Sequence, residues 1–188
     1  MMLFVNSCVN LRTSRTYRIA RELVRQLGGD VDEIVLGRED LVPLDSERVN
    51  RRTALAGAGD FSDPSFDNAH RFADADTVVI AASYWDFEFP AMLKTYLESV
   101  NVVGLTYRYG PDGVPTGMCR ASRMYYVTTA RGYLNGVNLG AEVLRSMCAM
   151  FGIPEFRCIS AEGLDIWGND ADAIVEEAIS GIPGVIGD

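Results

Sequence analysis

The sequence predicts an open parallel α/β sheet with helices on both faces. Five short apolar runs are typical of buried strands, and amphipathic helical patterns alternate with them along the chain. No internal repeat or low-complexity tract interrupts this alternation. The chain of 188 residues is close to the size of one ordinary domain, about 100–200 residues. We therefore expect residues 1–188 to form a single domain.

The first part of the chain is expected to hold two strands and one regular helix. Residues 3–5 form an apolar run that ends at polar residues, and residues 34–36 form a second such run. Between them, apolar side chains recur at helical spacing over residues 19–27, and Gly28-Gly29 ends the helix. Residues 38–66 are only weakly periodic, so we expect a long excursion there, with some helix around residues 48–56.

The pattern becomes more regular after this excursion. Residues 77–82 are apolar throughout and rich in β-branched side chains, as a central parallel strand buried on both faces should be. A helix is expected to begin near Pro90, a residue that is well tolerated at a helix start. The remaining expected elements are strands at 124–128 and 156–161, a helix at 139–151 closed by Gly152, and a helix at 171–179 capped by Asn169 or Asp170.

The composition excludes several classes of protein. The 17 basic and 26 acidic residues give a formal net charge of -9, which repels a phosphate backbone, so we expect no nucleic-acid partner. The longest strongly apolar run, residues 77–82, is far shorter than the ~20 residues that a membrane span needs. The first residues lack the basic segment of a signal peptide, so we expect a cytoplasmic protein with no membrane partner.

Few side chains suit catalysis by an acid, a base or a metal. The four cysteines are widely spaced and are expected to be free thiols in a reducing compartment. The single histidine, His70, lies in a helix-like stretch, where a solvated helix residue is a better interpretation than a catalytic one. We therefore expect no catalytic side chain and no metal site.

Ligands of open parallel sheets bind beyond the carboxyl ends of the strands, where the strand order reverses. Three loops follow expected strands at that edge, namely residues 6–16, 83–90 and 129–138. These loops are the candidate binding site.

The first of these loops opens directly onto a helix, which Ser14 or Thr16 is expected to cap. A helix N-terminus offers free N–H groups and partial positive charge, and Arg12 and Arg15 add guanidinium groups. This chemistry suits an anion such as a terminal phosphate. The alternative is an ordinary helix cap with solvated arginines. The loop has no glycine, so it is neither a Walker A nor a G-x-G-x-x-G loop.

The second loop carries four aromatic residues, Tyr84, Trp85, Phe87 and Phe89. Large rings that leave a buried strand need a surface to cover, and a planar aromatic cofactor is one. Alternatively, Phe87 and Phe89 pack under the following helix. In the third loop, Gly132 would let backbone amides approach a ligand closely.

Residues 84–94, YWDFEFPAMLK, resemble the signature of the flavodoxin-like NAD(P)H:quinone oxidoreductases and FMN-dependent NADH azoreductases. Members of this family typically have an M-Y-N-F-like segment followed by an apolar helix that contains L-K-x-Y. Three further segments occur in matching order, namely residues 14–16, 106–109 and 161–164. The resemblance covers nearly the whole chain. It implies a flavodoxin-like three-layer sandwich whose five-stranded parallel sheet has the order 2-1-3-4-5.

The resemblance also implies an FMN-binding homodimer with active sites at the subunit interface. Ser14, Arg15 and Thr16 would hold the FMN phosphate, with Cys8 at the edge of the same loop. The isoalloxazine ring would meet Tyr84, Trp85, Asp86 and Phe87, and its pyrimidine side would lie along Thr129, Ala130, Arg131 and Gly132. Tyr107 and Tyr109 would shape the open face for the substrate, from a long loop near the interface.

This chain departs from the family pattern at three places. Asp86 stands where the best-known azoreductases have Asn, Trp85 stands where they have Tyr, and residues 130–133 replace a more usual R-G-G. Two interpretations of Asp86 remain open. Its carboxylate either accepts a hydrogen bond from flavin N3–H and opposes reduction of the ring, or it points to solvent while its backbone meets the flavin.

The activity that the resemblance implies is a ping-pong reaction. NAD(P)H would give hydride to FMN, and a quinone, azo or nitro compound would then take the electrons. The alternative is an electron-transfer flavodoxin, a carrier without a substrate site. The long loop at 101–120 argues against that alternative, because a carrier has little use for a covered flavin face. A flavin-free receiver-like module is a poor third interpretation, because the acidic pair of a receiver is expected where this chain has residues 6–8.

Overall fold

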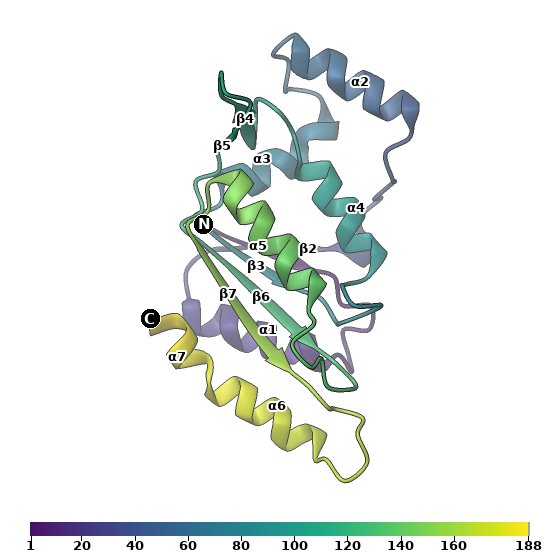
Figure 1. Cartoon of the computed structure of the whole chain (residues 1–188), viewed down its shortest axis with the longest axis vertical. Coiled ribbons are helices and arrows are strands. Elements are labelled where there is room, and N and C mark those ends of the chain that lie inside the picture. The colour runs from purple at the N-terminus through teal and green to yellow at the C-terminus, as the bar shows by residue number, and fades with distance from the viewer. Residues whose placement is uncertain (188) are drawn as a thin grey trace.

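The computed structural model describes residues 1–187 and confirms the expected fold class (Figure 1). The main sheet is parallel and has the order β2-β1-β3-β6-β7, which is the expected order 2-1-3-4-5. Its strands are β1 (Met2–Asn6), β2 (Val31–Val35), β3 (Thr77–Ala81), β6 (Arg123–Thr129) and β7 (Glu155–Ala161). The α-helices are α1 (Arg15–Leu27), α2 (Ser46–Gly57), α3 (Asp67–Asp74), α4 (Ala91–Val100), α5 (Leu139–Phe151), α6 (Ala171–Ser180) and α7 (Ile182–Gly187). Two short 3₁₀ turns, η1 (Leu36–Arg38) and η2 (Pro64–Phe66), lie in the excursion between β2 and α3.

Two hydrophobic cores lie on opposite faces of the sheet. On β3, Val78 and Ile80 pack in the core that α4 and α5 cover, whereas Val79 and Ala81 pack in the core that α1 and α6 cover. All four side chains are fully buried. Successive strand residues face opposite sides, so a strand covered on both sides shows a continuous apolar run instead of an alternation.

Helix α1 begins at the carboxyl edge of the sheet, and specific residues cap both of its ends. The Ser14 hydroxyl accepts a hydrogen bond from the Tyr17 N–H at 3.1 Å, so Ser14 and not Thr16 caps the helix. At the other end, Gly28 has φ 66°, a conformation that favours glycine and ends the helix. The loop between β1 and α1 thereby becomes one wall of the site described below.

The segment between α4 and β6 differs from the expected long loop. It contains an antiparallel hairpin of two short strands, β4 (Tyr107–Tyr109) and β5 (Pro115–Gly117). The Cys119 N–H donates to the Phe151 carbonyl at the end of α5, and Arg120 binds Asp76, which precedes β3. The hairpin therefore lies at the amino edge of the sheet, opposite the carboxyl ends of the strands (Figure 1).

His70 differs from the expected solvated helix residue. It is half-buried on α3, and its Nε2 lies 2.8 Å from the Phe61 carbonyl oxygen. Within residues 1–187, no helix combines the length and the apolar character that a membrane crossing needs.

Candidate functional site at the carboxyl edge of the sheet

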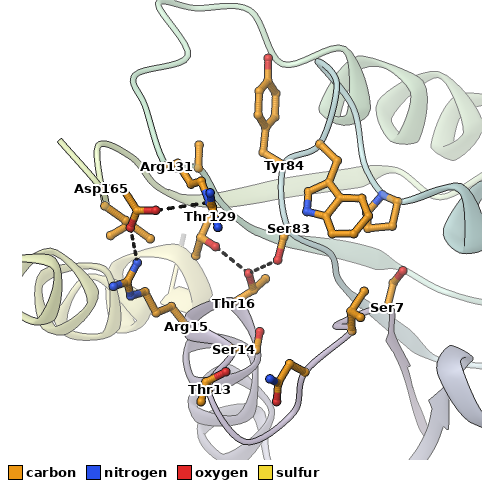
Figure 2. Close-up of a pocket in the computed structure, with 16 residues that line it drawn as sticks. Ser7, Thr13, Ser14, Arg15, Thr16, Ser83, Tyr84, Thr129, Arg131 and Asp165 are labelled. Atoms are coloured by element: carbon orange, nitrogen blue, oxygen red, sulfur yellow. Dashed lines mark hydrogen bonds and ion pairs between the residues drawn. The ribbon is translucent and has the colours of Figure 1, made fainter.

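A pocket of about 360 Å³ opens at the carboxyl edge of the sheet (Figure 2). The three loops that the sequence predicted line it, and the loop after β7 adds a fourth wall. The lining contains eight of the predicted contacts, namely Ser14–Thr16, Tyr84, Trp85 and Thr129–Arg131. Its size falls in the range of ligand pockets, about 300–1,000 Å³.

Three hydroxyl groups join three of the walls at the floor of the pocket. The Thr16 hydroxyl lies 2.9 Å from the Ser83 hydroxyl and 2.6 Å from the Thr129 hydroxyl (Figure 2). Thr16 is fully buried. This cluster ties the start of α1 to the ends of β3 and β6, so the loops are fixed relative to one another.

The start of α1 supplies donors for an anion. Within residues 1–187, the backbone N–H groups of Arg15 and Thr16 have no protein acceptor, because the Ser14 hydroxyl is bonded to Tyr17. Among the described residues, the buried hydroxyl of Ser7 also lacks a hydrogen-bond partner, and Ser7 lines the same pocket. A buried polar group without a partner is costly, so this hydroxyl fits a site that a polar ligand completes. The donor set suits FMN, whose phosphate and ribityl hydroxyls would accept and donate here.

An acidic residue that the sequence did not single out organises two arginines at the rim. Asp165 accepts from Arg15 at 2.9 Å and lies 3.3 Å from Arg131 on its other oxygen (Figure 2). One carboxylate between two guanidinium groups leaves a net positive charge beside the free N–H groups. The signal that could have found Asp165 is its place directly after residues 161–164, which carry part of the family resemblance.

A tight turn forms the aromatic wall. Trp85 and Glu88 exchange backbone hydrogen bonds of 3.2 and 2.8 Å, and the turn residues Asp86 and Phe87 have φ 48° and 72°. Two consecutive positive φ angles are typical of the type I′ turn, which usually holds Asn-Gly. The Leu139 N–H also donates to the Phe87 carbonyl at 3.1 Å, which fixes the turn against the start of α5.

Phe87→Gly is expected to stabilise the protein. A side chain in the left-handed region costs about 1–2 kcal/mol, and Phe87 is 62% exposed, so little packing is lost. We expect an increase of roughly 2–4 °C in Tm, as about 1 kcal/mol gives for a chain of this size. Thermal unfolding of the apoprotein measures it, and a lower Tm would show that the ring packs more tightly than its exposure indicates. If Phe87 meets the flavin as the resemblance implies, the same variant binds FMN more weakly.

Some predicted contacts lie outside the pocket lining. Asp86, Phe87 and Gly132 lie beside the pocket, with Asp86 and Phe87 exposed at the tip of the turn. Cys8 is buried in the core under α1, and this burial raises the pKa of its thiol to about 11. The Cys8 side chain thus lies outside the pocket lining.

Tyr107 and Tyr109 are not brought to the pocket of their own chain. They lie in β4 at the opposite edge of the sheet, where Tyr107 is buried against Phe151. The sequence could not reveal this, because strands of three residues are too short to show a periodicity. A role at an open flavin face would require that a second chain present these tyrosines.

Comparisons with known proteins agree with the fold. The family model described as flavodoxin-like fold matches residues 2–182. The chain is 33% identical over 174 residues to the FMN-dependent NADH:quinone oxidoreductase of Clostridium beijerinckii, and 31% identical over 176 residues to FMN-dependent NADH:quinone oxidoreductase 2 of Clostridium acetobutylicum. Each alignment covers 88% of this chain and 87% of the relative.

Among solved structures, an azoreductase from Bacillus anthracis superimposes with a TM-score of 0.85 at 21% identity, covering 98% of this chain and 97% of the other. An FMN-dependent NADH-azoreductase from Bacillus anthracis, in complex with FMN, gives a TM-score of 0.82 at 18% identity and covers 97% and 96%. At these identities the superpositions support the fold alone. Taken with the family match and the two clostridial relatives, they lead to one conclusion: the chain belongs to the flavodoxin-like family of the FMN-dependent NADH:quinone oxidoreductases.

Proposed function

We propose that this protein is an FMN-dependent oxidoreductase that uses NADH to reduce quinones, with azo and nitro compounds as further acceptors. The observation that supports it most directly is the pocket at the carboxyl edge, where free helix N–H groups, an unpartnered buried hydroxyl and an aromatic wall meet. The names of the two clostridial relatives state the FMN-dependent NADH:quinone oxidoreductase activity.

Different residues of the pocket would bind different parts of the cofactor. The phosphate would be held by the backbone N–H groups of Arg15 and Thr16 and by the Arg15 guanidinium. The Ser7 hydroxyl would bind a polar group of the ribityl chain of FMN. Tyr84 and Trp85 would flank the ring, with the backbone of residues 129–131 along its pyrimidine side. When bound, FMN supplies the two-electron chemistry that links NADH to the acceptor in a ping-pong cycle.

The protein would contribute position and charge rather than an acid or a base. Its histidine lies on α3, bonded to Phe61. Arg131 reaches Asp165 at the rim and would place positive charge near the pyrimidine side, where a reduced ring carries negative charge.

An electron carrier is the second candidate, and one observation bears on it. The sequence disfavours a carrier because residues 101–120 are expected to cover the flavin. In a single chain, however, the β4–β5 hairpin of this segment lies at the amino edge of the sheet, opposite the pocket. The test is oxidation of NADH by the FMN-loaded protein with a quinone and no other protein. We expect turnover without a separate reductase; an absolute requirement for a reductase would favour the carrier.

We further propose a homodimer in the cytoplasm, with each site completed at the interface. An exposed aromatic face around Trp85 and Phe87, 50% and 62% exposed, would be buried in such a dimer. Sedimentation at micromolar concentration is expected to give twice the mass of one chain. A monomer with full NADH:quinone activity would contradict the shared site.

Asp86→Asn is expected to raise the FMN midpoint potential only slightly. Asp86 is exposed at the turn, so a charge about 7 Å from the ring acts through solvent and contributes about 0.6 kcal/mol, against about 2 kcal/mol at an effective dielectric near 20. For two electrons these energies correspond to about 13 mV and about 40 mV. Potentiometric titration of the wild type and the Asp86→Asn variant at low salt distinguishes these two shifts in midpoint potential. A shift near 40 mV would place the Asp86 carboxylate at the ring.

A further inference from the structure

Two tight turns are joined to each other beside the pocket. The first is the aromatic turn, residues 85–88, and the second, which we call the support turn, is residues 134–137. In the support turn the Val137 N–H donates to the Leu134 carbonyl at 2.9 Å, and Asn135 and Gly136 have φ 50° and 81°. Asn-Gly with two positive φ angles is typical of a type I′ turn, so the support turn has a well-defined shape.

A tyrosine hydroxyl bridges the two turns. Tyr84, directly before the aromatic turn, donates to the Val137 carbonyl at 3.0 Å, across 53 positions of the sequence. Figure 2 shows the Tyr84 ring pointing away from the hydroxyl cluster at the floor of the pocket, so this bond is separate from that cluster. Tyr84 stands at the methionine of the M-Y-N-F-like pattern. A methionine side chain has no hydrogen to donate, so this chain has a bond that the pattern does not provide.

The support turn is itself fixed at both of its ends. The Leu134 N–H donates to the Glu162 carboxylate at 2.8 Å, which ties the turn to the loop after β7, and the Leu134 side chain is buried. At its other end the turn leads into α5, which the Asn138 side chain caps. Tyr84 therefore connects the aromatic turn to a support that other contacts already hold in place.

Gly140 lets the start of α5 approach the aromatic turn closely. A Cβ at Gly140 would lie 2.9 Å from the Phe89 ring and 3.3 Å from the Glu88 backbone. Gly140 is buried, and the preceding Leu139 N–H donates to the Phe87 carbonyl. Because this contact and both hydrogen bonds come from the start of α5 and the turn before it, the position of that segment sets the position of the aromatic turn.

We propose that the Tyr84 hydroxyl and Gly140 are positioning groups for the ring end of the flavin site, an inference that rests on the proposed function. They hold the aromatic turn so that Trp85 stands where the isoalloxazine ring is bound. Trp85 lines the pocket and is 50% exposed, so burial of its own side chain does not fix the turn. Without these contacts the turn would be ordered only when flavin binds, and that ordering would weaken binding.

Tyr84→Phe tests the hydroxyl, because it removes the hydrogen bond and keeps the ring. It should weaken FMN and riboflavin by the same factor, roughly two- to tenfold, since the phosphate end of the site is unchanged. A tryptophan in contact with a flavin ring quenches its fluorescence by electron transfer. The emission of FMN bound at saturation should therefore rise when Trp85 is no longer held in place. Fluorescence titration of the apoprotein with each flavin measures both quantities.

Gly140→Ala tests the close contact without removing a hydroxyl. The added Cβ would push the aromatic turn outward, so the emission of bound FMN should rise as it does in Tyr84→Phe. Tyr125→Phe is the matched control. It also removes a tyrosine hydroxyl that takes part in a hydrogen bond, from Arg123 at 2.9 Å, but near the amino end of β6. This control should bind both flavins as the wild type does, with unchanged emission.

The outcomes separate this inference from the proposed function. Wild-type affinity and emission in Tyr84→Phe or in folded Gly140→Ala would overturn the inference. A loss in Tyr84→Phe that affects FMN alone would also overturn it, because the effect would then lie at the phosphate end. If Gly140→Ala does not fold, Tyr84→Phe alone decides. The proposed function would be wrong for a different reason, namely if the wild-type protein bound neither flavin.

Discussion

Arg15→Ala is expected to weaken FMN binding by roughly 5- to 150-fold while it changes riboflavin binding little. The Arg15 side chain reaches the rim where α1 begins, and its backbone N–H is one of the free donors of that helix end. A charge-assisted bond to a dianionic phosphate contributes about 1–3 kcal/mol, which gives that range of affinity. Fluorescence titration of the apoprotein with each flavin measures it.

Asp165→Asn is the matched control for this prediction. Asp165 shares its charge between Arg15 and Arg131, so its loss frees the Arg15 guanidinium for the phosphate and removes a nearby negative charge. This variant should bind FMN more tightly than the wild type and riboflavin equally well. If Arg15→Ala weakens both flavins to the same degree, the α1 end does not hold the phosphate.

Gly117→Ala is expected to destabilise the protein by about 3 kcal/mol, the upper end of the usual cost of overpacking. A Cβ at Gly117 would lie 1.9 Å from the Phe151 carbonyl carbon and 2.0 Å from the Gly152 nitrogen. Both are backbone atoms, which cannot rotate away as a side chain can. The β4–β5 hairpin would have to separate from the end of α5, and Tm should fall by roughly 6–12 °C.

Gly37→Ala provides the comparison, because a Cβ at Gly37 meets nothing within 4 Å. That variant should unfold within about 0.5 kcal/mol of the wild type. Chemical denaturation of the three proteins gives the free energies of unfolding. Similar free energies of unfolding for Gly117→Ala and Gly37→Ala would mean that the backbone at Gly117 does not lie this close to the backbone of Phe151 and Gly152.

The main sheet and the position of the site could be predicted because both follow from local patterns. Buried runs such as residues 77–82 mark parallel strands, and the carboxyl-edge rule then selects the loops without any knowledge of contacts. The sequence predicts Ser14 or Thr16 as the N-cap of α1. The hydrogen bond that the Tyr17 N–H donates to the Ser14 hydroxyl shows that Ser14 is the cap.

The parts that could not be predicted depend on long-range contacts. Asp165 reaches Arg15 across 150 positions of the sequence, and no local pattern encodes that pairing. The placement of Tyr107 depends on the crossing of Gly117 with the end of α5, which the sequence does not reveal. Cys8 follows the first strand, but the local sequence does not say that its thiol turns toward the core.

The hydroxyl cluster at the pocket floor has a consequence for the rate of cofactor uptake. The Thr16 hydroxyl is bonded to both the Ser83 and the Thr129 hydroxyl, and these bonds join protein groups alone, so they hold three walls of the pocket together without help from a ligand. A preformed site has little conformational entropy to lose on binding. FMN should therefore associate in a single kinetic phase whose rate rises linearly with flavin concentration, without the plateau that a slow rearrangement of the loops would impose.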